Sequence, residues 1–159
     1  MAIRNIIKEH DESDDVLHKK CRPVEEFNDK LALIIDDMIE TLKEANGFGL
    51  AASQIGLLRR ICVLCPDPNG DVIELVNPVI TAKHGKKDGV EGCLSFPGLD
   101  ALITRPEKVT VEGFDRHGKP VTVQGEGLLA VGICHEIDHL DGVTVRDRMI
   151  YNMSRAERL

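Results

Sequence analysis

The clearest hydrophobic pattern lies between residues 29 and 44, where apolar side chains recur at intervals of three and four. The repeating positions are Leu31, Ile34, Ile35, Met38, Ile39 and Leu42. Asn28 is a residue type that caps helix N-termini, and Asn46-Gly47 is a typical helix end. The sequence therefore predicts an amphipathic N-terminal helix over residues 29–44 that packs one face against a core.

Short runs of β-branched and apolar residues alternate with turn residues further along the chain. Two pairs of such runs are joined by turns rich in Pro, Asp, Asn and Gly: 60–65 with 72–76, and 109–114 with 121–123. Each pair predicts an antiparallel hairpin.

A second helix is predicted from about Glu126 to Leu140, with Gly142 as its C-terminal stop. It is apolar nearly all round, and such a helix is normally buried at the centre of a fold. We therefore expect an α+β fold in which antiparallel sheets surround this C-terminal helix. Residues 154–159 are expected to begin another short helix.

Length, composition and charge narrow the class of protein. The 159 residues fit a single domain over 1–159, and no repeat or linker-like tract divides them. A net charge of −7 and the absence of Trp disfavour nucleic-acid binding. The sequence also lacks a membrane-spanning apolar stretch, and residues 1–10 do not resemble a targeting peptide. We expect a cytoplasmic protein that does not bind membranes.

Five cysteines in a chain of this kind indicate free thiols or metal ligands rather than disulfides. Cys62 and Cys65 have the spacing of a zinc knuckle or a redox pair, but the sequence holds no second pair of this spacing. Residues three apart on a strand point to opposite faces, so both are expected to pack in the core.

The strongest chemical signal is the H-E-x-x-H pattern formed by His135, Glu136 and His139 on the predicted buried helix. Helical geometry puts the two imidazoles on one face, about 5–6 Å apart, where both can bind one metal ion. Glu136 is offset by about 100° and is free to accept a proton from a water molecule. The alternative is a pair of core histidines that are hydrogen-bonded to backbone.

A catalytic metal site usually has three protein ligands and one open position, so a third ligand is needed. A histidine six residues past His139 is absent, because Val145 stands there, and Glu157 lies in the C-terminal tail. Cys93 is the better candidate, since a thiolate complements two imidazoles and the glycine beside it allows a close backbone approach. A buried structural cysteine is the alternative.

A third unusual segment, residues 47–54, combines glycines and alanines with Gln54. Small residues suit a site where the backbone of a ligand lies against the chain, and the Gln54 amide offers an N–H donor for a developing oxyanion. A glycine-rich helix end followed by a loop explains the same residues equally well.

Together, the segments 47–54 (GFGLAASQ), 91–95 (EGCLS) and 135–142 (HEIDHLDG) resemble, in order and spacing, the three signature motifs of the peptide deformylases. The resemblance implies an α+β fold of antiparallel sheets around a central metal-binding helix. It also implies a hydrolase that removes the formyl group from N-formylmethionyl nascent peptides and releases formate.

The resemblance assigns a role to each of six residues: Cys93, His135 and His139 bind the metal, Glu136 is general base and then general acid, and Gln54 and the backbone N–H of Leu94 hold the oxyanion. The implied metal is one Fe²⁺ per chain, for which Ni²⁺, Co²⁺ or Zn²⁺ can substitute.

The implied substrate contacts come from the same three segments. The methionine side chain enters a pocket lined by Phe48, Leu128, Val131 and Gly132. The peptide backbone pairs as an added strand with two short stretches, Gly47 to Gly49 and Gly89 to Glu91.

Three departures and two rivals leave parts of this interpretation open. Ser13-Asp14-Asp15 replaces the Gly-Asp-Pro that is usual in the family before Val16-Leu17. Asp100 stands where many relatives carry an arginine near the downstream end of the peptide. The sequence stops at Leu159, short of the terminal helix with which other members contact the ribosome, so that partner is carried over only as an open hypothesis. The rivals are an H-E-x-x-H protease with Glu157 as third ligand and a peptide- or metal-binding module without turnover.

Overall fold

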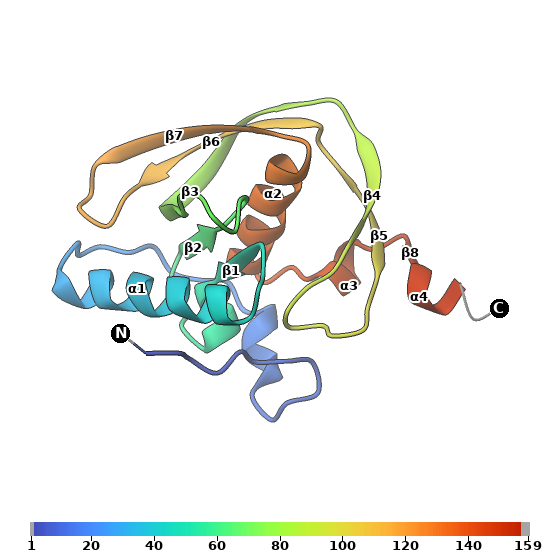
Figure 1. Cartoon of the computed structure of the whole chain (residues 1–159), viewed down its shortest axis with the longest axis horizontal. Helices are drawn as coiled ribbons and strands as arrows, with labels where there is room; N and C mark the ends of the chain where they lie inside the picture. The colour runs from blue at the N-terminus through green and yellow to red at the C-terminus, as the bar shows by residue number, and fades with distance from the viewer. Residues whose placement is uncertain (1, 157–159) are drawn as a thin grey trace.

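The computed structural model describes residues 2–156, which form an α+β fold of two antiparallel sheets around a central helix (Figure 1). In chain order the elements are the 3-10 helix η1 (Asp14–His18), α1 (Asp29–Glu44), β1 (Gly49–Ala51), the 3-10 helix η2 (Ala52–Ile55), β2 (Ile61–Leu64), β3 (Ile73–His84), β4 (Lys87–Glu91), β5 (Ala101–Arg105), β6 (Lys108–Phe114), β7 (Pro120–Glu126), α2 (Leu128–Leu140), α3 (Val145–Arg148), β8 (Tyr151–Asn152) and α4 (Met153–Ala156). Among the helices of this described part, none has both the length and the apolarity that a membrane crossing requires.

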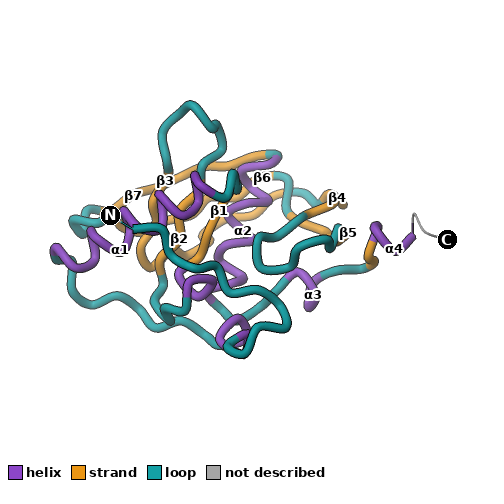
Figure 2. Tube along the Cα trace, turned by 60° about the horizontal axis from the view of Figure 1, so that its bottom comes forward, coloured by secondary structure: helices purple, strands orange, loops and turns teal. Residues whose placement is uncertain are grey.

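The two sheets position the central helix. The larger sheet has the strand order β1-β2-β3-β6-β7 and the smaller one the order β4-β5-β8, with every neighbouring pair antiparallel. Helix α2 packs against β1, β2 and β7 of the larger sheet and also contacts β5. Figure 2 shows α2 between the strands of the larger sheet and the pair β4–β5. Strands β1 and β4 are both edge strands, so each leaves one backbone edge unpaired beside α2.

The predicted amphipathic helix is confirmed as α1. The Asn28 side chain accepts a hydrogen bond from the Leu31 N–H at 3.1 Å, which is the expected N-cap contact. Its apolar face is buried in a cluster with Ile61 and Val63 of β2. Burial of each large aliphatic side chain there contributes about 1.5–3 kcal/mol. Helix α1 therefore fixes the outer face of the larger sheet.

Both predicted hairpins are present, as β2–β3 and β6–β7. Strand β3 nevertheless continues to His84, beyond the predicted end at residue 76. Its register shifts between Val76 and Val79, where Asn77 has a φ of 51°. The Asn77 side chain bonds both the N–H and the C=O of Val24, at 2.8 and 2.9 Å, and so holds this bulge. A bulge accommodates Pro78 inside a strand, which the hydrophobic pattern alone did not indicate.

The predicted central helix is confirmed, but its start was two residues too early. Glu126 belongs to β7, and Gly127, with a φ of 62°, makes the turn from strand to helix. The helix is buried from Gly132 to Leu140, whereas Leu128 in its first turn is 77% exposed. At its other end Gly142 has a φ of 75°, and a Cβ there would lie 2.7 Å from the His18 carbonyl oxygen. Only glycine fits this stop.

Other elements were not predicted. The smaller sheet was missed because β4 contains Lys87, Asp88 and Gly89 and shows no alternation of apolar and polar residues.

The cysteine prediction is confirmed, since Cys62 and Cys65 are buried in different core clusters on opposite faces of the larger sheet. The predicted helix over 154–159 is observed as α4; residues 157–159 of that prediction lie outside the described residues.

Candidate active site

A cleft of about 480 Å³ lies between the edges of β1 and β4 and the outer turns of α2. Twelve of the predicted site residues line it: Gly47, Phe48, Gly49, Gln54, Glu91, Cys93, Leu94, Leu128, Val131, Gly132, His135 and Glu136. Of the remaining two, His139 is buried behind the cleft, and Gly89 lines a neighbouring cavity that shares the Val90 wall. The three motifs, far apart in the sequence, therefore meet in one cleft.

The structure brings the three candidate metal ligands together. One donor atom each from Cys93, His135 and His139 lies within 4.8 Å of the others, and the Cys93 Sγ is 3.3 Å from the His139 Nε2. The two imidazole rings, one helical turn apart on α2, have centroids 5.0 Å apart. Among the side chains that the structure describes, this is the one such group of three. A sulfur and two nitrogen donors form a set that suits Zn²⁺, Fe²⁺, Co²⁺ or Ni²⁺.

The surroundings of the two histidines shift their pKa values in opposite directions. Burial and the charge of His135 hold the pKa of His139 well below its usual value, so His139 is a neutral imidazole with a free lone pair. Burial also opposes the charging of His135, but the charge of Glu136 and the contacts with Cys93 and Glu91 raise the pKa of His135 well above its usual value. Negative surroundings that hold a proton on His135 favour a divalent cation in its place.

Glu136 combines burial with a missing hydrogen bond. Its side chain points toward β1, where a Cβ on Gly49 would lie 2.5 Å from the Glu136 Oε2. The Oε1 atom is buried and makes no hydrogen bond to any described residue. Burial raises the pKa of Glu136 to about 7, against the opposing charges of His135 and Arg105. A carboxyl group with a pKa near neutrality can both accept and return a proton.

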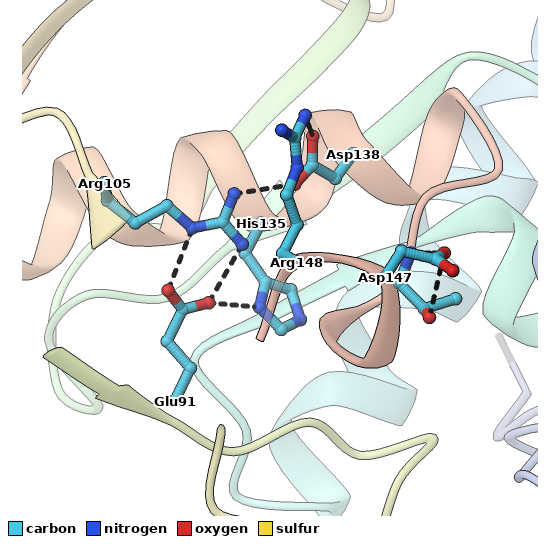
Figure 3. A network of polar contacts seen from close by, with 7 residues as sticks. Glu91, Arg105, His135, Asp138, Asp147 and Arg148 are labelled. Atoms are coloured by element: carbon cyan, nitrogen blue, oxygen red, sulfur yellow. Dashed lines mark hydrogen bonds and ion pairs between the residues drawn. The ribbon is translucent and has the colours of Figure 1, made fainter. Parts of the chain in front are cut away.

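A buried ion-pair network holds the first histidine of the motif (Figure 3). The Glu91 Oε1 lies 2.9 Å from the His135 Nδ1, and Arg105 donates two hydrogen bonds to Glu91 at 2.9 and 3.0 Å. Arg105 also donates to Asp138 at 2.6 Å. Burial opposes the charging of Glu91, but the bonds from His135 and Arg105 outweigh it and lower the pKa of Glu91.

Sequence reasoning missed this network. It assigned Glu91 only to peptide pairing and gave no role to Arg105 or Asp138. The contacts join residues 14 to 44 positions apart, and no periodic pattern reports such pairs. Charged residues inside apolar segments were the available signal.

Gln54 is fixed at both ends of its amide group. Its Oε1 accepts a hydrogen bond from the Ala51 N–H at 2.9 Å, and its Nε2 donates to the Ser95 Oγ at 3.0 Å. The same Nε2 lies 3.8 Å from the Cys93 Sγ, so the amide N–H group faces the candidate metal site. Ser95 is fully buried, and sequence reasoning did not identify it. Leu94, next to Cys93, also lines the cleft.

Glycines shape the cleft in two different ways. A Cβ at Gly132 would lie 2.4 Å from the Phe48 ring, so this glycine lets the ring pack directly on α2. A Cβ at Gly92 or Gly89 would meet nothing within 4 Å. The expectation that the glycine beside Cys93 serves a close backbone approach stays a prediction, and the open space beside Gly92 leaves room for such an approach.

At the position of a third histidine the described residues offer no rival to Cys93. Val145, at the position of a third histidine, is buried beneath the smaller sheet. Glu157 lies outside the described residues.

A family profile and individual relatives identify the same family of similar proteins. A sequence profile of the family described as polypeptide deformylase matches residues 3–155. "Peptide deformylase 2" of Clostridium acetobutylicum is 47% identical over 148 residues, which cover 92% of this chain and 95% of that protein. A peptide deformylase of Thermoanaerobacter pseudethanolicus is 46% identical over 158 residues, covering 99% of this chain and 96% of the relative.

Solved structures show the same architecture. A crystal structure of a peptide deformylase from Legionella pneumophila superposes with a TM-score of 0.90 at 43% identity, covering 98% of this chain and 90% of the other. A peptide deformylase from Synechococcus elongatus, solved in complex with actinonin, gives a TM-score of 0.88 at 34% identity, covering 97% of this chain and 82% of that one.

Proposed function

Because the chain belongs to the polypeptide deformylase family, we propose a role for each part of its cleft in the family's reaction. The protein is a metallohydrolase that removes the N-formyl group from nascent peptides. We propose that residues 1–159 act as one catalytic domain in the bacterial cytoplasm, on chains that emerge from the ribosome. The bacterial relatives support this setting.

Cys93, His135 and His139 would hold one metal ion, for which we propose Fe²⁺, with Ni²⁺, Co²⁺ or Zn²⁺ able to substitute. The fit of the donor set supports a metal of this class, and the family resemblance supports iron. When bound, such a cation supplies Lewis acidity, which lowers the pKa of a water molecule and polarises the formyl carbonyl.

Glu136 is the proton carrier. Its carboxylate accepts a proton from the attacking water and delivers it to the amine that leaves as formate is released. The pKa of about 7 supports both steps, and the position of the side chain beside the ligand set rather than within it supports a role other than ligation.

Gln54 and the backbone N–H of Leu94 stabilise the negative charge that develops on the formyl oxygen when water adds to the formyl carbon. The bond from Ala51 holds the Gln54 amide so that its N–H group faces Cys93 before substrate arrives. A preorganised donor of this kind needs no rearrangement as charge develops.

The substrate lies between the two open strand edges. The methionine side chain enters the pocket lined by Phe48, Leu128, Val131 and Gly132. The peptide backbone adds a strand between Gly47–Gly49, which lead into β1, and Gly89–Glu91 of β4. Edge strands offer unpaired backbone groups to any sequence, which suits an enzyme that must act on all nascent chains.

Asp100 shapes specificity downstream of methionine. Its side chain lines the cleft and accepts a hydrogen bond from the Ser154 hydroxyl at 2.6 Å. The acidic residues that line the cleft are Glu91, Asp100 and Glu136, and the described lining includes no lysine or arginine. We therefore propose that basic or neutral residues are preferred to acidic ones. Formyl-Met-Ala-Lys should give a higher kcat/KM than formyl-Met-Ala-Glu at low salt, and a preference for Glu would remove Asp100 from this role.

The observation that carries the proposal is the ligand triad facing a cleft that also holds a buried glutamate. Purified protein should release formate from formyl-Met-Ala-Ser and leave acetyl-Met-Ala-Ser intact, whereas cleavage of an internal peptide bond would favour the protease alternative. Because ferrous iron beside a thiolate is prone to oxidation, the iron form should lose activity in air faster than the nickel form. Equal lifetimes would argue against iron.

A further inference from the structure

The ion-pair network around Glu91 continues to the protein surface (Figure 3). Arg148, the last residue of α3, donates from Nε and Nη2 to the two carboxylate oxygens of Asp138, each at 3.1 Å. Asp138 also accepts from Arg105, Arg105 holds Glu91, and Glu91 contacts the His135 Nδ1. A continuous series of polar contacts therefore leads from a half-exposed side chain to a proposed metal ligand.

Charge and geometry give Arg148 a specific place in this series. Glu91, Arg105 and Asp138 are all buried, and together they carry one net negative charge. All three guanidinium nitrogens of Arg105 are engaged, two with Glu91 and one with Asp138. Arg148 neutralises the group and gives Asp138 a two-pronged partner of its own. Arg105 can then keep two of its three nitrogens on Glu91.

Contacts in the first turn of α3 hold the backbone of the short helix that carries Arg148. The Asp147 carboxylate accepts hydrogen bonds from the Thr144 N–H at 2.8 Å and the Thr144 hydroxyl at 3.2 Å, which caps α3. Val145, in the first turn of α3, is buried under the smaller sheet. The first turn of the short helix is thus anchored by its cap and by Val145, and the side chain of its last residue contacts Asp138 on α2.

We propose that Arg148 is a positioning residue for metal binding, which acts through Asp138, Arg105 and Glu91 to fix the ring of His135. This inference rests on the proposed role of His135 as a ligand. Loss of an outer partner that contacts a ligand directly typically costs about 10–100-fold in metal affinity or activity. Arg148 acts through three intermediates, so we expect its loss to speed metal release by about 5- to 10-fold, near or below the low end of that range.

The test measures how fast Co²⁺ leaves the loaded protein for a chelator, followed by the cobalt–thiolate absorption. Arg148→Gln should release cobalt about 5- to 10-fold faster than the natural sequence. Arg146→Gln is a matched control, because Arg146 lies on the same helix and forms a similar two-pronged contact with Glu9, outside the network. Its release rate should stay within about twofold of the natural protein.

The direction of the change separates positioning from simple electrostatics. Removal of a positive charge by itself favours a bound cation, so a purely electrostatic role predicts slower release from Arg148→Gln. In an Asp138→Asn background the effect of Arg148→Gln should vanish, because the contact through which Arg148 acts is already altered.

Slower or unchanged release from Arg148→Gln, or a full effect that persists beside Asp138→Asn, would overturn the proposal. A preliminary measurement distinguishes failure of the proposed role of Arg148 from failure of the assignment of His135 as a metal ligand. The natural protein should bind one cobalt per chain, and His135→Ala should lose it. If His135→Ala keeps its cobalt, both proposals are wrong; if it loses cobalt and Arg148→Gln behaves like the natural protein, only the positioning role is wrong.

Discussion

Gly49→Ala tests the position of the Glu136 carboxylate without altering any charged or ligating group. A Cβ at residue 49 would lie 2.5 Å from the Glu136 Oε2, 2.9 Å from its Cδ and 3.0 Å from its Cγ. Ordinary contact begins near 3.4 Å, so the carboxylate or strand β1 has to move by about 0.9 Å. Glu136 is buried, so little room exists for that movement. A displacement of about 1 Å in a reacting group can cost about 10²-fold in rate.

We therefore expect kcat for formyl-Met-Ala-Ser to fall by about 10²-fold, and any movement of β1 to appear separately as a rise in KM, because Gly49 also belongs to the proposed peptide-binding edge. Formate release gives the kinetic constants, elemental analysis gives the metal content, and urea unfolding reports any overpacking, which typically costs about 1–3 kcal/mol. Metal content should remain near one per chain, because the clash involves Glu136 rather than a ligand. A near-normal kcat would show that the carboxylate is not required where the structure has it, and loss of metal would show that the clash reaches His135.

Three other substitutions test the methionine pocket, the proton carrier and the pH dependence of stability. Gly132→Ala would bring a Cβ to 2.4 Å from the Phe48 ring and narrow the methionine pocket, so KM for formyl-Met-Ala-Ser should rise by about 10-fold with a smaller change in kcat; an unchanged KM would argue against this pocket. Glu136→Gln keeps the shape of the side chain but removes its basicity, so kcat should fall by about 10²–10⁴-fold with metal retained, and a variant that loses its metal would instead mark Glu136 as a ligand. Hydrogen bonds from the Ala2 N–H and Arg4 lower the pKa of Asp37 below its unfolded value, so its contribution to stability is present at neutral pH and is lost as the pH falls below about 4. Urea midpoints at pH 7 and pH 3 should therefore differ less for Asp37→Asn than for the natural protein, and equal differences would exclude this contribution.

Sequence patterns predicted the helix that carries the two histidines, and helix α1, better than they predicted the strands around them. The spacing of His135 and His139 on an apolar segment was sufficient, because helical geometry alone puts residues four apart on one face. Helix α1 was equally readable from its repeat and its Asn28 cap. In both cases the signal lies within one element.

The features that were missed depend on contacts between elements. Strand β3 continues past Pro78 because Asn77 is held by Val24, which is 53 residues away. Strand β4 has no hydrophobic alternation, and pairing with β5 determines its conformation. The partners of Glu91 become visible only when β4, β5 and α2 are assembled. A sequence pattern records the residue types but not these long-range pairings.

We propose that Cys93, His135 and His139 would hold one metal ion, and that removal of the formyl group depends on the Lewis acidity this ion would supply. The most direct test compares metal content and formate release in Cys93→Ala and in Cys65→Ala. Cys65 is a matched control, because it is buried in the core cluster under α1, on the face of the larger sheet that lies away from α2. We expect about one metal per chain and near-normal formate release for Cys65→Ala. For Cys93→Ala we expect loss of most of the metal together with the activity. Retention of one metal per chain by Cys93→Ala, with formate release intact, would contradict it.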